Sequence, residues 1–319
     1  MARIVLFGQA QFGQRVFEEV LARGHEVTAV CVPPDAPGRP ADPLKAAAAE
    51  RSVRVVQRRS YRDDGAAAEV AADAADLGVL AYVTQIIPRT ILDAPRLASI
   101  CFHPSLLPAY RGGSAINWQL INGERIGGVT LFRPDDGIDE GPIYLQRQIE
   151  IGPDDSAGSY YYGRVFEAGI TATLDCIELV LSGKAEPRVQ DEAQATYEPL
   201  CRDEHAGVDW SLPAQRLHDL IRGCDPSPGA HCRFGDAQVR LYGSRIASAG
   251  GTVAAPGTVV ALDDKGVTVA AGEGSVLVQK LGVAGRKLAA GEGAAALGLA
   301  AGARLDGAPG LPAAKARLI

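Results

Sequence analysis

The first 150 residues alternate between short β-branched apolar runs and segments with apolar residues at helical spacing. The apolar runs predict strands at residues 3–7, 26–32, 53–56, 79–83 and 99–102. The segments between them predict helices at residues 14–21, 44–50 and 66–77. Strands that alternate with helices favour a Rossmann-like, mostly parallel, doubly wound sheet. Right-handed crossovers then place the functional loops at the carboxyl ends of the strands.

Two further strands are predicted at 128–132 and 143–149, and a long amphipathic helix at 156–182. The pattern changes after about residue 203. A helix at 213–222 is followed by short alternating strands, separated by Gly, Asp and Pro, at 238–242, 257–261, 267–270 and 275–279. This pattern indicates a small β-barrel of the OB-like kind. We therefore expect two domains, 1–203 and 204–319, and the last 30 residues, rich in Ala and Gly, specify little structure.

Composition excludes several classes of protein. The chain has 47% hydrophobic and 22% charged residues, and no apolar stretch approaches the roughly 20 residues of a membrane span. The N-terminus enters a strand at once, which predicts a cytoplasmic protein without a signal peptide and without a membrane partner. The six cysteines are scattered and are expected to be reduced thiols. A net charge of -6 without a basic stripe argues against a dedicated nucleic-acid binder.

The first turn, residues 8–13, reads Gly-Gln-Ala-Gln-Phe-Gly between a strand and a helix. Dinucleotide loops have the spacing G-x-G-x-x-G, so that the backbone can approach a pyrophosphate. Gln9 and Ala10 stand where that approach needs glycine. A tight turn that binds no nucleotide is therefore the favoured interpretation.

His103 lies at the predicted end of a strand, where a loop with two prolines and two glycines begins. A histidine at a strand end is more often a structural hydrogen bonder than a catalyst. Ser105 lacks the G-x-S-x-G elbow of serine hydrolases. Cys101 lies within a strand expected to be buried, where cysteine usually acts as a small hydrophobe. By itself, this stretch supports no nucleophile.

The acidic loop 135–141 allows three interpretations. A calcium loop would need the D-x-D-x-D-G spacing, which is absent, and no metal is expected here. A solvated turn is the simplest alternative. In the third interpretation, Asp139 pairs with a histidine from a neighbouring strand. Such a carboxylate orients the imidazole and helps a water or an amine lose its proton while a carbonyl oxygen is stabilised.

The two loops together resemble the folate-dependent formyltransferase family. The resemblance rests on residues 103–108, His-Pro-Ser-Leu-Leu-Pro, on 110–112, Tyr-Arg-Gly, and on 136–141, Asp-Gly-Ile-Asp-Glu-Gly. It covers nearly the whole chain. Stretches at 8–13, 41–44, 85–88 and 114–118 are similar to the hydrolase domain of 10-formyltetrahydrofolate dehydrogenases. Stretches at 208–214 and 284–287 are similar to the carboxyl-terminal half of methionyl-tRNA formyltransferases.

This resemblance implies that domain 1–203 binds 10-formyltetrahydrofolate as the one-carbon donor. It places the catalytic histidine on His103 and the essential aspartate on Asp139. His103 would stabilise the oxyanion, and Asp139 would orient His103 and help remove the proton of the nucleophile. The resemblance also implies two segments that line the folate site, Gln85, Ile86 and Ile87 in one and Asp135, Asp136, Gly137 and Ile138 in the other.

The chain departs from the family at Cys101, where formyltransferases usually carry an asparagine whose amide donates to the oxyanion. A thiol is a weak donor, and losing one such donor typically costs about 10²–10³ in rate. We therefore count Cys101 with the candidate catalytic residues, as the position that decides which reaction the site performs.

The expected reaction is transfer of a formyl, or related one-carbon, group to the amine of a small molecule. Three alternatives remain open: a 10-formyltetrahydrofolate hydrolase, a methionyl-tRNA formyltransferase and a folate-binding pseudo-enzyme. A tRNA partner is possible but not favoured, because residues 33–40 carry one arginine where the tRNA enzymes have a longer Gly/Lys-rich loop. These motifs leave the acceptor and the oligomeric state open.

Overall fold

The structure, a computed structural model, describes residues 1–71, 74–251 and 254–308. The chain forms two compact units. The first comprises residues 1–113, 128–149 and 164–196, and the second comprises 114–127, 150–163 and 197–319. Within the described residues, no helix is both long enough and apolar enough to cross a membrane.

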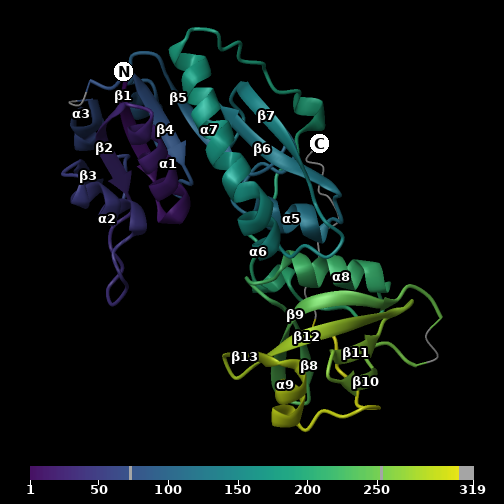
Figure 1. The fold of residues 1–319 in the computed structure, drawn as a ribbon. Helices are drawn as coiled ribbons and strands as arrows, with labels where there is room; N and C mark the ends of the chain where they lie inside the picture. The colour runs from purple at the N-terminus through teal and green to yellow at the C-terminus, as the bar shows by residue number, and fades with distance from the viewer. Residues whose placement is uncertain (72–73, 252–253, 309–319) are drawn as a thin grey trace. The chain divides into compact units, whose positions relative to one another are not determined.

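The first unit is built on a sheet of seven strands in the order β3-β2-β1-β4-β5-β6-β7 (Figure 1). The strands are β1 Arg3–Gly8, β2 Glu26–Val32, β3 Arg54–Gln57, β4 Leu77–Ala81, β5 Ala98–His103, β6 Ile126–Phe132 and β7 Ile143–Glu150. Neighbours from β3 to β5 pair in parallel, and β6 pairs antiparallel with β5. The Rossmann-like, mostly parallel sheet is confirmed.

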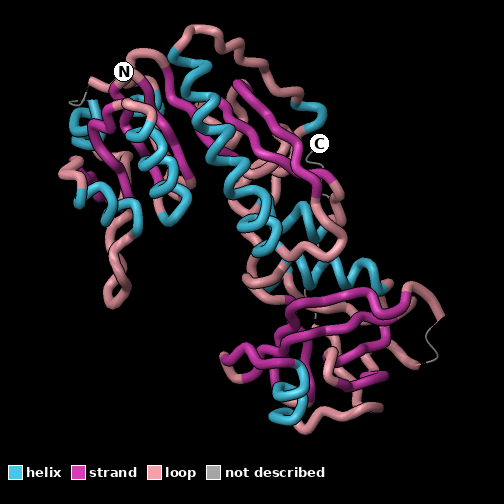
Figure 2. The backbone as a smooth tube through the Cα atoms, viewed as in Figure 1, coloured by secondary structure: helices cyan, strands magenta, loops and turns pink. Residues whose placement is uncertain are grey.

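Helices cover both faces of this sheet (Figure 2). Val5 and Phe7 of β1 belong to one apolar cluster with α3 (Asp64–Ala71) and α4 (Arg89–Leu92). Because side chains alternate along a strand, Ile4 and Leu6 face the other side. On that side α1 (Ala10–Ala22) packs against β1, β2 and β4, and also against α2 (Pro43–Glu50) and α7 (Phe166–Leu181).

One predicted helix is too long. Residues 66–77 were expected to be helical, but α3 is described only to Ala71, residues 72–73 lie outside the described residues, and Leu77 begins β4. Leu77 is fully buried and pairs with Ile4 of β1 and Ala98 of β5. Pairing in the sheet therefore outweighs the helical propensity of the alanine-rich stretch. At the other end, Tyr82 has a φ of 63° and follows the last residue of β4.

The long helix predicted at 156–182 is present, but it is not regular throughout. Its parts are α6 (Ala157–Tyr160), a π-helical turn (Tyr161–Val165) and α7. The spacing of apolar residues in the sequence does not reveal a single π-helical turn, because such a turn interrupts the α-helical repeat only locally.

The second unit contains the smaller β-domain. Its sheet has the order β10-β11-β12-β9-β8, and β13 pairs with β12. The strands are β8 Ala230–Phe234, β9 Ala237–Ser248, β10 Val259–Asp263, β11 Gly266–Ala270, β12 Ser275–Val283 and β13 Arg286–Ala289. All of these pairings are antiparallel. Strands β8 and β13 were not predicted.

Residues 303–306 join the two edges of this sheet. Ala303 O accepts a hydrogen bond from Val259 N of β10, and Asp306 exchanges two backbone hydrogen bonds with Arg233 of β8. The segment lies in the part of the chain that seemed to specify little. Its backbone closes the sheet, because it reaches both β10 and β8.

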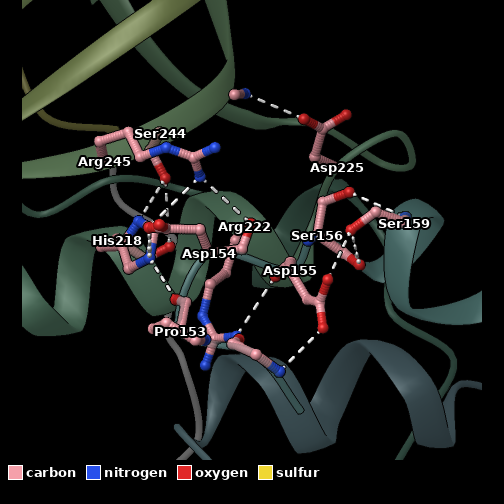
Figure 3. A network of polar contacts seen from close by, with 12 residues as sticks. Pro153, Asp154, Asp155, Ser156, Ser159, His218, Arg222, Asp225, Ser244 and Arg245 are labelled. Carbon is pink, nitrogen blue, oxygen red and sulfur yellow. Dashed lines mark hydrogen bonds and ion pairs between the residues drawn. The ribbon is translucent and has the colours of Figure 1, made fainter. Parts of the chain in front are cut away.

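Three helices pack in this unit: α5 (Ala115–Ile121) lies on α8 (Ala214–Gly223), α8 lies on β9, and α9 (Ala290–Leu297) lies on β12. A buried polar network extends from α8. His218 and Arg222 bond to the loop 152–155, and Ser244 of β9 bonds to His218 (Figure 3). The network is internal to the second unit.

Candidate active site

His103 is the last residue of β5, and its ring is 5% exposed. Its Nε2 lies 2.7 Å from the carbonyl oxygen of Tyr110, seven residues later. A carbonyl only accepts, so Nε2 carries a proton and donates it. The other nitrogen, Nδ1, lies 3.4 Å from Oδ2 of Asp139. The structure therefore brings together the two residues that the sequence suggested as a catalytic pair.

The loop after His103 is fixed by side chains from β6 and β7. Thr130 of β6 donates from Oγ1 to Ser105 O at 2.6 Å and accepts from Leu107 N at 3.1 Å. Gln146 of β7 donates to Leu107 O at 2.8 Å. The Ser105 hydroxyl is buried and donates to Ala109 O at 2.7 Å. Ser105 thus supports the loop, in agreement with the absence of a serine-hydrolase motif.

Asp139 has a φ of 59°, in the left-handed region that few residues other than glycine adopt. Its Oδ2 also accepts a hydrogen bond of 2.8 Å from Gly112 N. The loop that carries Asp139 is closed by Arg133 N, which donates to Pro142 O at 2.9 Å. A Cβ at Gly141 would lie 1.8 Å from Arg133 O, so only glycine fits there. The hydrogen bond from Gly112 N holds the Asp139 carboxylate beside His103, on a loop whose backbone is closed.

Cys101 is half-buried and packs against Leu107, Phe132 and Ile143. Burial raises the pKa of its thiol well above the usual value, and the charge of Asp139 raises it further. The raised pKa favours the protonated thiol, and a thiol is a weaker nucleophile than a thiolate. Because the Asp139 charge acts on it, this thiol belongs to the surroundings of the His103–Asp139 pair.

The two segments expected to bind the folate lie side by side. Arg89 pairs with Asp136 at 3.7 Å and with Asp93 at 2.8 Å, and Arg133 pairs with Asp93 at 3.4 Å. Ile86 and Ile138 are 61% and 55% exposed. The side chains of Gln85 and Ile87 turn inward: the Gln85 amide donates to Arg58 O at 2.9 Å, and Ile87 enters the core. Asp135 Oδ1 accepts from Gly137 N at 3.1 Å, which shapes the turn.

The backbone of the first glycine turn, residues 8–13, donates a hydrogen bond to a carboxylate of the protein itself, that of Asp42. Asp42 accepts a hydrogen bond of 2.8 Å from Ala10 N at the start of α1, and one of 2.9 Å from Leu44 N. A Cβ on Gly8 would lie 2.6 Å from Ala81 O, so close packing of β1 and β4 requires this glycine.

Three residues near the pair had no role in the sequence-based prediction. Arg111 is fully buried and bonds to Gln190, Gln190 bonds to the backbone around Asp139, and Thr196 bonds to Tyr110. Arg111 stood within a quoted motif, but Gln190 and Thr196 lie far along the chain and carried no signal of their own. Among the described residues, no group of three or more His, Cys, Asp or Glu could hold a metal ion.

A pocket of about 650 Å³ is a separate feature of the second unit, and its lining contains none of these residues. Its lining includes Arg240, Arg286 and Lys287. Arg240 pairs with Asp203 at 2.8 Å and Lys287 with Asp225 at 3.0 Å, so two of the three cations have carboxylate partners. The chemistry described above does not depend on this pocket.

Comparisons with known proteins identify the family of the chain. Residues 2–176 match the model of the formyl transferase family, and residues 201–296 match that of the formyl transferase carboxyl-terminal domain. A methionyl-tRNA formyltransferase of Geobacter sulfurreducens is 36% identical over 290 residues, which cover 89% of this chain and 90% of the relative. The mitochondrial 10-formyltetrahydrofolate dehydrogenase of Mus musculus is 41% identical over 249 residues. The match covers 76% of this chain but 27% of the dehydrogenase.

Solved structures show the same fold at low sequence identity. HypX from Aquifex aeolicus, solved in complex with tetrahydrofolic acid, has a TM-score of 0.68 at 22% identity, over 93% of this chain and 47% of HypX. The sugar 3N-formyl transferase WlaRD has a TM-score of 0.68 at 17% identity, over 90% of this chain and 99% of WlaRD. The match to the family model over more than half of the residues decides the assignment: this chain belongs to the formyl transferase family.

Proposed function

We propose that this protein moves a formyl group from 10-formyltetrahydrofolate to the amine of a small molecule. The observation that carries the proposal is the placement of His103 Nδ1 3.4 Å from Asp139 Oδ2 at the carboxyl end of β5, in a chain of this family. Functional groups collect at the carboxyl ends of strands in open α/β sheets. His103 and Asp139 are the proposed catalytic residues.

The folate would lie against the two neighbouring segments 85–87 and 135–138. Ile86 and Ile138 present exposed apolar side chains suited to the faces of a pterin ring. Backbone groups of 135–138 would bond to the ring edge. The folate is a substrate in this proposal, because it gives up its formyl group and leaves as tetrahydrofolate.

The hydrogen bonds of the pair support one route for the protons of the proposed reaction. His103 Nε2–H is committed to Tyr110 O, so a proton on Nδ1 would face Asp139 and the reacting carbonyl. The doubly protonated ring can stabilise the oxyanion that forms when the amine attacks the formyl carbon. Asp139 Oδ1 is left to accept the proton of the amine, because Oδ2 already accepts from Gly112 N. Collapse of the tetrahedral intermediate breaks the bond between the formyl carbon and the folate nitrogen. As it leaves, this nitrogen takes the proton that Asp139 accepted from the amine.

Hydrolysis of 10-formyltetrahydrofolate is a second candidate, favoured by one residue. Cys101 offers only a weak donor where formyltransferases usually have an amide, and the 41% identical relative is a 10-formyltetrahydrofolate dehydrogenase. Water would then replace the amine as the nucleophile, and formate would be the product. The same pair would serve both reactions.

A single assay with several acceptors separates these functions. Purified protein is given 10-formyltetrahydrofolate alone, with a panel of amines including amino sugars, or with aminoacylated initiator tRNA. Formylated small molecules, detected by mass spectrometry, support the proposal, and formate without an acceptor supports the hydrolase. Formylation of the tRNA alone identifies a tRNA enzyme. Folate binding with no turnover in any arm contradicts both candidates and identifies a pseudo-enzyme.

A further inference from the structure

Residues 188–196 run past both loops of the candidate site, and they lie between the two segments that match family models, 2–176 and 201–296. We infer that this segment positions the catalytic pair, with Gln190 acting on Asp139 and Thr196 acting on the loop that holds His103. The inference rests on the proposed function, because it assigns positioning residues to that reaction. Gln190 and Thr196 are positioning residues, because their hydrogen bonds reach the backbone of the two loops and not the side chains of the pair.

Gln190 holds the backbone on both sides of the Asp139–Gly141 turn. It is 6% exposed, and its Nε2 donates to Asp139 O at 2.8 Å and to Gly141 O at 2.7 Å. Its Oε1 accepts from Arg111 Nη2 at 2.8 Å. Carbonyl oxygens only accept and a guanidinium only donates, so the amide can have no other orientation. All four hydrogen bonds of the amide are used, counting the one of 3.2 Å from Arg111 Nε.

Arg111 fixes Gln190 in turn. Its side chain is fully buried, and besides Gln190 it bonds to both carboxylate oxygens of Glu192, at 2.6 and 2.9 Å. A bidentate contact holds a guanidinium in one plane. Arg111 also follows Tyr110 and precedes Gly112, the two residues whose backbone bonds to His103 and Asp139. One side chain thus connects the segment to both loops.

Thr196 acts on the other loop. Its Oγ1 accepts from Tyr110 N at 2.7 Å, its carbonyl accepts from Arg111 N at 2.9 Å, and its N–H donates to Pro108 O at 3.1 Å. Tyr110 is the residue whose carbonyl accepts from His103 Nε2. Thr196 therefore sets the position of the group that orients the His103 ring.

Backbone strain explains why such support is needed. Asp139 has a φ of 59° and Tyr110 a φ of 62°. Residues with a side chain adopt this region only where the surrounding structure holds them there. The two strained residues are the direct partners of His103, and segment 188–196 bonds to both. Without these bonds, the turns would relax and the pair would separate.

The first test compares Gln190→Ala with Gln194→Ala. Gln194 lies four residues away and bonds only to the exposed Asp191, so it is a matched control. We expect Gln190→Ala to lower kcat by about 10- to 100-fold, because small displacements of reacting groups are that costly, with KM for 10-formyltetrahydrofolate unchanged. Gln194→Ala should resemble wild type. Wild-type kcat in Gln190→Ala overturns the inference.

A double variant shows whether Gln190 acts through Asp139. Adding Gln190→Ala to Asp139→Ala should cause no further loss, because the group to be positioned is already gone. A full second loss would mean that Gln190 acts elsewhere and would overturn the inference. Thr196→Val provides a second route if Gln190→Ala does not fold, since it keeps the shape and removes only Oγ1. It too should lower kcat with KM unchanged.

Hydrogen exchange separates this inference from the proposed function, because it needs no activity. In Gln190→Ala, the amides of residues 135–141 and of Gly112 should exchange at least about tenfold faster than in wild type and in Gln194→Ala. If wild type neither transfers nor hydrolyses the formyl group, the proposed function fails, while exchange still decides whether the segment holds the loops. Unchanged exchange in Gln190→Ala overturns the positioning role.

Discussion

Two buried histidines, one in each compact unit, have similar surroundings and different capacities. His103 is 5% exposed and donates from Nε2 to Tyr110 O at 2.7 Å. His218 is 1% exposed and has Pro153 O 2.9 Å from its Nε2 (Figure 3). Each has a carboxylate at a longer distance, Asp139 at 3.4 Å and Asp154 at 3.7 Å. Burial, a carbonyl partner and a nearby carboxylate therefore do not by themselves identify a catalytic histidine.

The second ring nitrogen makes the difference. His218 Nδ1 lies 2.8 Å from Ser244 Oγ, so both nitrogens of that ring have hydrogen-bonding partners. His103 Nδ1 instead faces a carboxylate held on a strained backbone, at a distance beyond a normal hydrogen bond. We therefore expect His103, and not His218, to take part in the proposed reaction, because only the second nitrogen of the His103 ring faces a carboxylate without a short hydrogen bond.

The largest expected effect tests this comparison directly. His103→Ala should lower turnover of 10-formyltetrahydrofolate about a thousandfold, because it removes both the proton and the charge that stabilise the oxyanion. His218→Ala should keep wild-type turnover per folded molecule. Steady-state kinetics on both variants, with the folded fraction measured by circular dichroism, provides the check. Equal losses in the two variants would contradict the distinction between the histidines.

The second prediction concerns stability. Here the buried network of α8 should matter more than the hydrogen bonds around the His103–Asp139 pair. Arg222 and Asp219 are 1% and 3% exposed and lie 2.8 Å apart, so Asp219→Ala leaves a buried guanidinium without its carboxylate. We expect a loss of about 3 kcal/mol in the free energy of unfolding. Arg245→Ala, which removes a 3.3 Å partner of Asp154 with both side chains about half exposed, is the control and should cost less than about 1 kcal/mol.

Tryptophan fluorescence suits this measurement, because both tryptophans of the chain, Trp118 and Trp210, belong to the second unit. Denaturant unfolding of Asp139→Ala should leave this signal unchanged. A shift of the midpoint in Asp139→Ala as large as that in Asp219→Ala would show that the two networks do not differ in the way we describe.

The smallest expected effect is a dependence of stability on pH. Burial lowers the pKa of His218 below the usual value, although Asp154 and Asp219 act in the opposite direction and Arg222 reinforces burial. Below about pH 6.5, His218 binds a proton in the unfolded chain more readily than in the folded chain. The free energy of unfolding should therefore decrease as the pH falls through this range. The midpoint of tryptophan-detected unfolding should decrease between pH 7.5 and 5.5, and less so in His218→Asn. An identical pH dependence in the variant would remove His218 as the cause.

Much of the first unit could be predicted because local pattern and tertiary packing agree there. The strand Glu26–Val32 is apolar and β-branched, and it is buried between two parallel neighbours, which is what its sequence requires. Leu77 shows the opposite case, because the alanine-rich sequence before it favours a helix that would include it, whereas its pairing with β1 and β5 places it in the sheet. The segment that closes the small barrel was also missed, since backbone bonds such as that of Ala303 need no particular side chain.

Some residues of the candidate site could likewise be predicted from the sequence, and others could not. His103 and Asp139 lie in compact motifs, so a resemblance could suggest them, and the structure brings them together. Gln190 and Thr196 act through hydrogen bonds formed across 51 and 86 positions of sequence. No spacing in the sequence marks such a contact, because it depends on where α7 returns the chain. The polar residues that hold a site are therefore harder to predict than those that react in it.

Segment 188–196 has a consequence for anyone who would transplant this catalytic centre. A gene fragment ending where the first family match ends, at residue 176, would encode both His103 and Asp139. It would lack the glutamine and the threonine that hold them, and it would leave the Arg111 guanidinium without its acceptors. A fragment meant for transfer to another protein must therefore extend past residue 196. A chimera joined at residue 176 would contain His103 and Asp139 without the segment that we infer to position them.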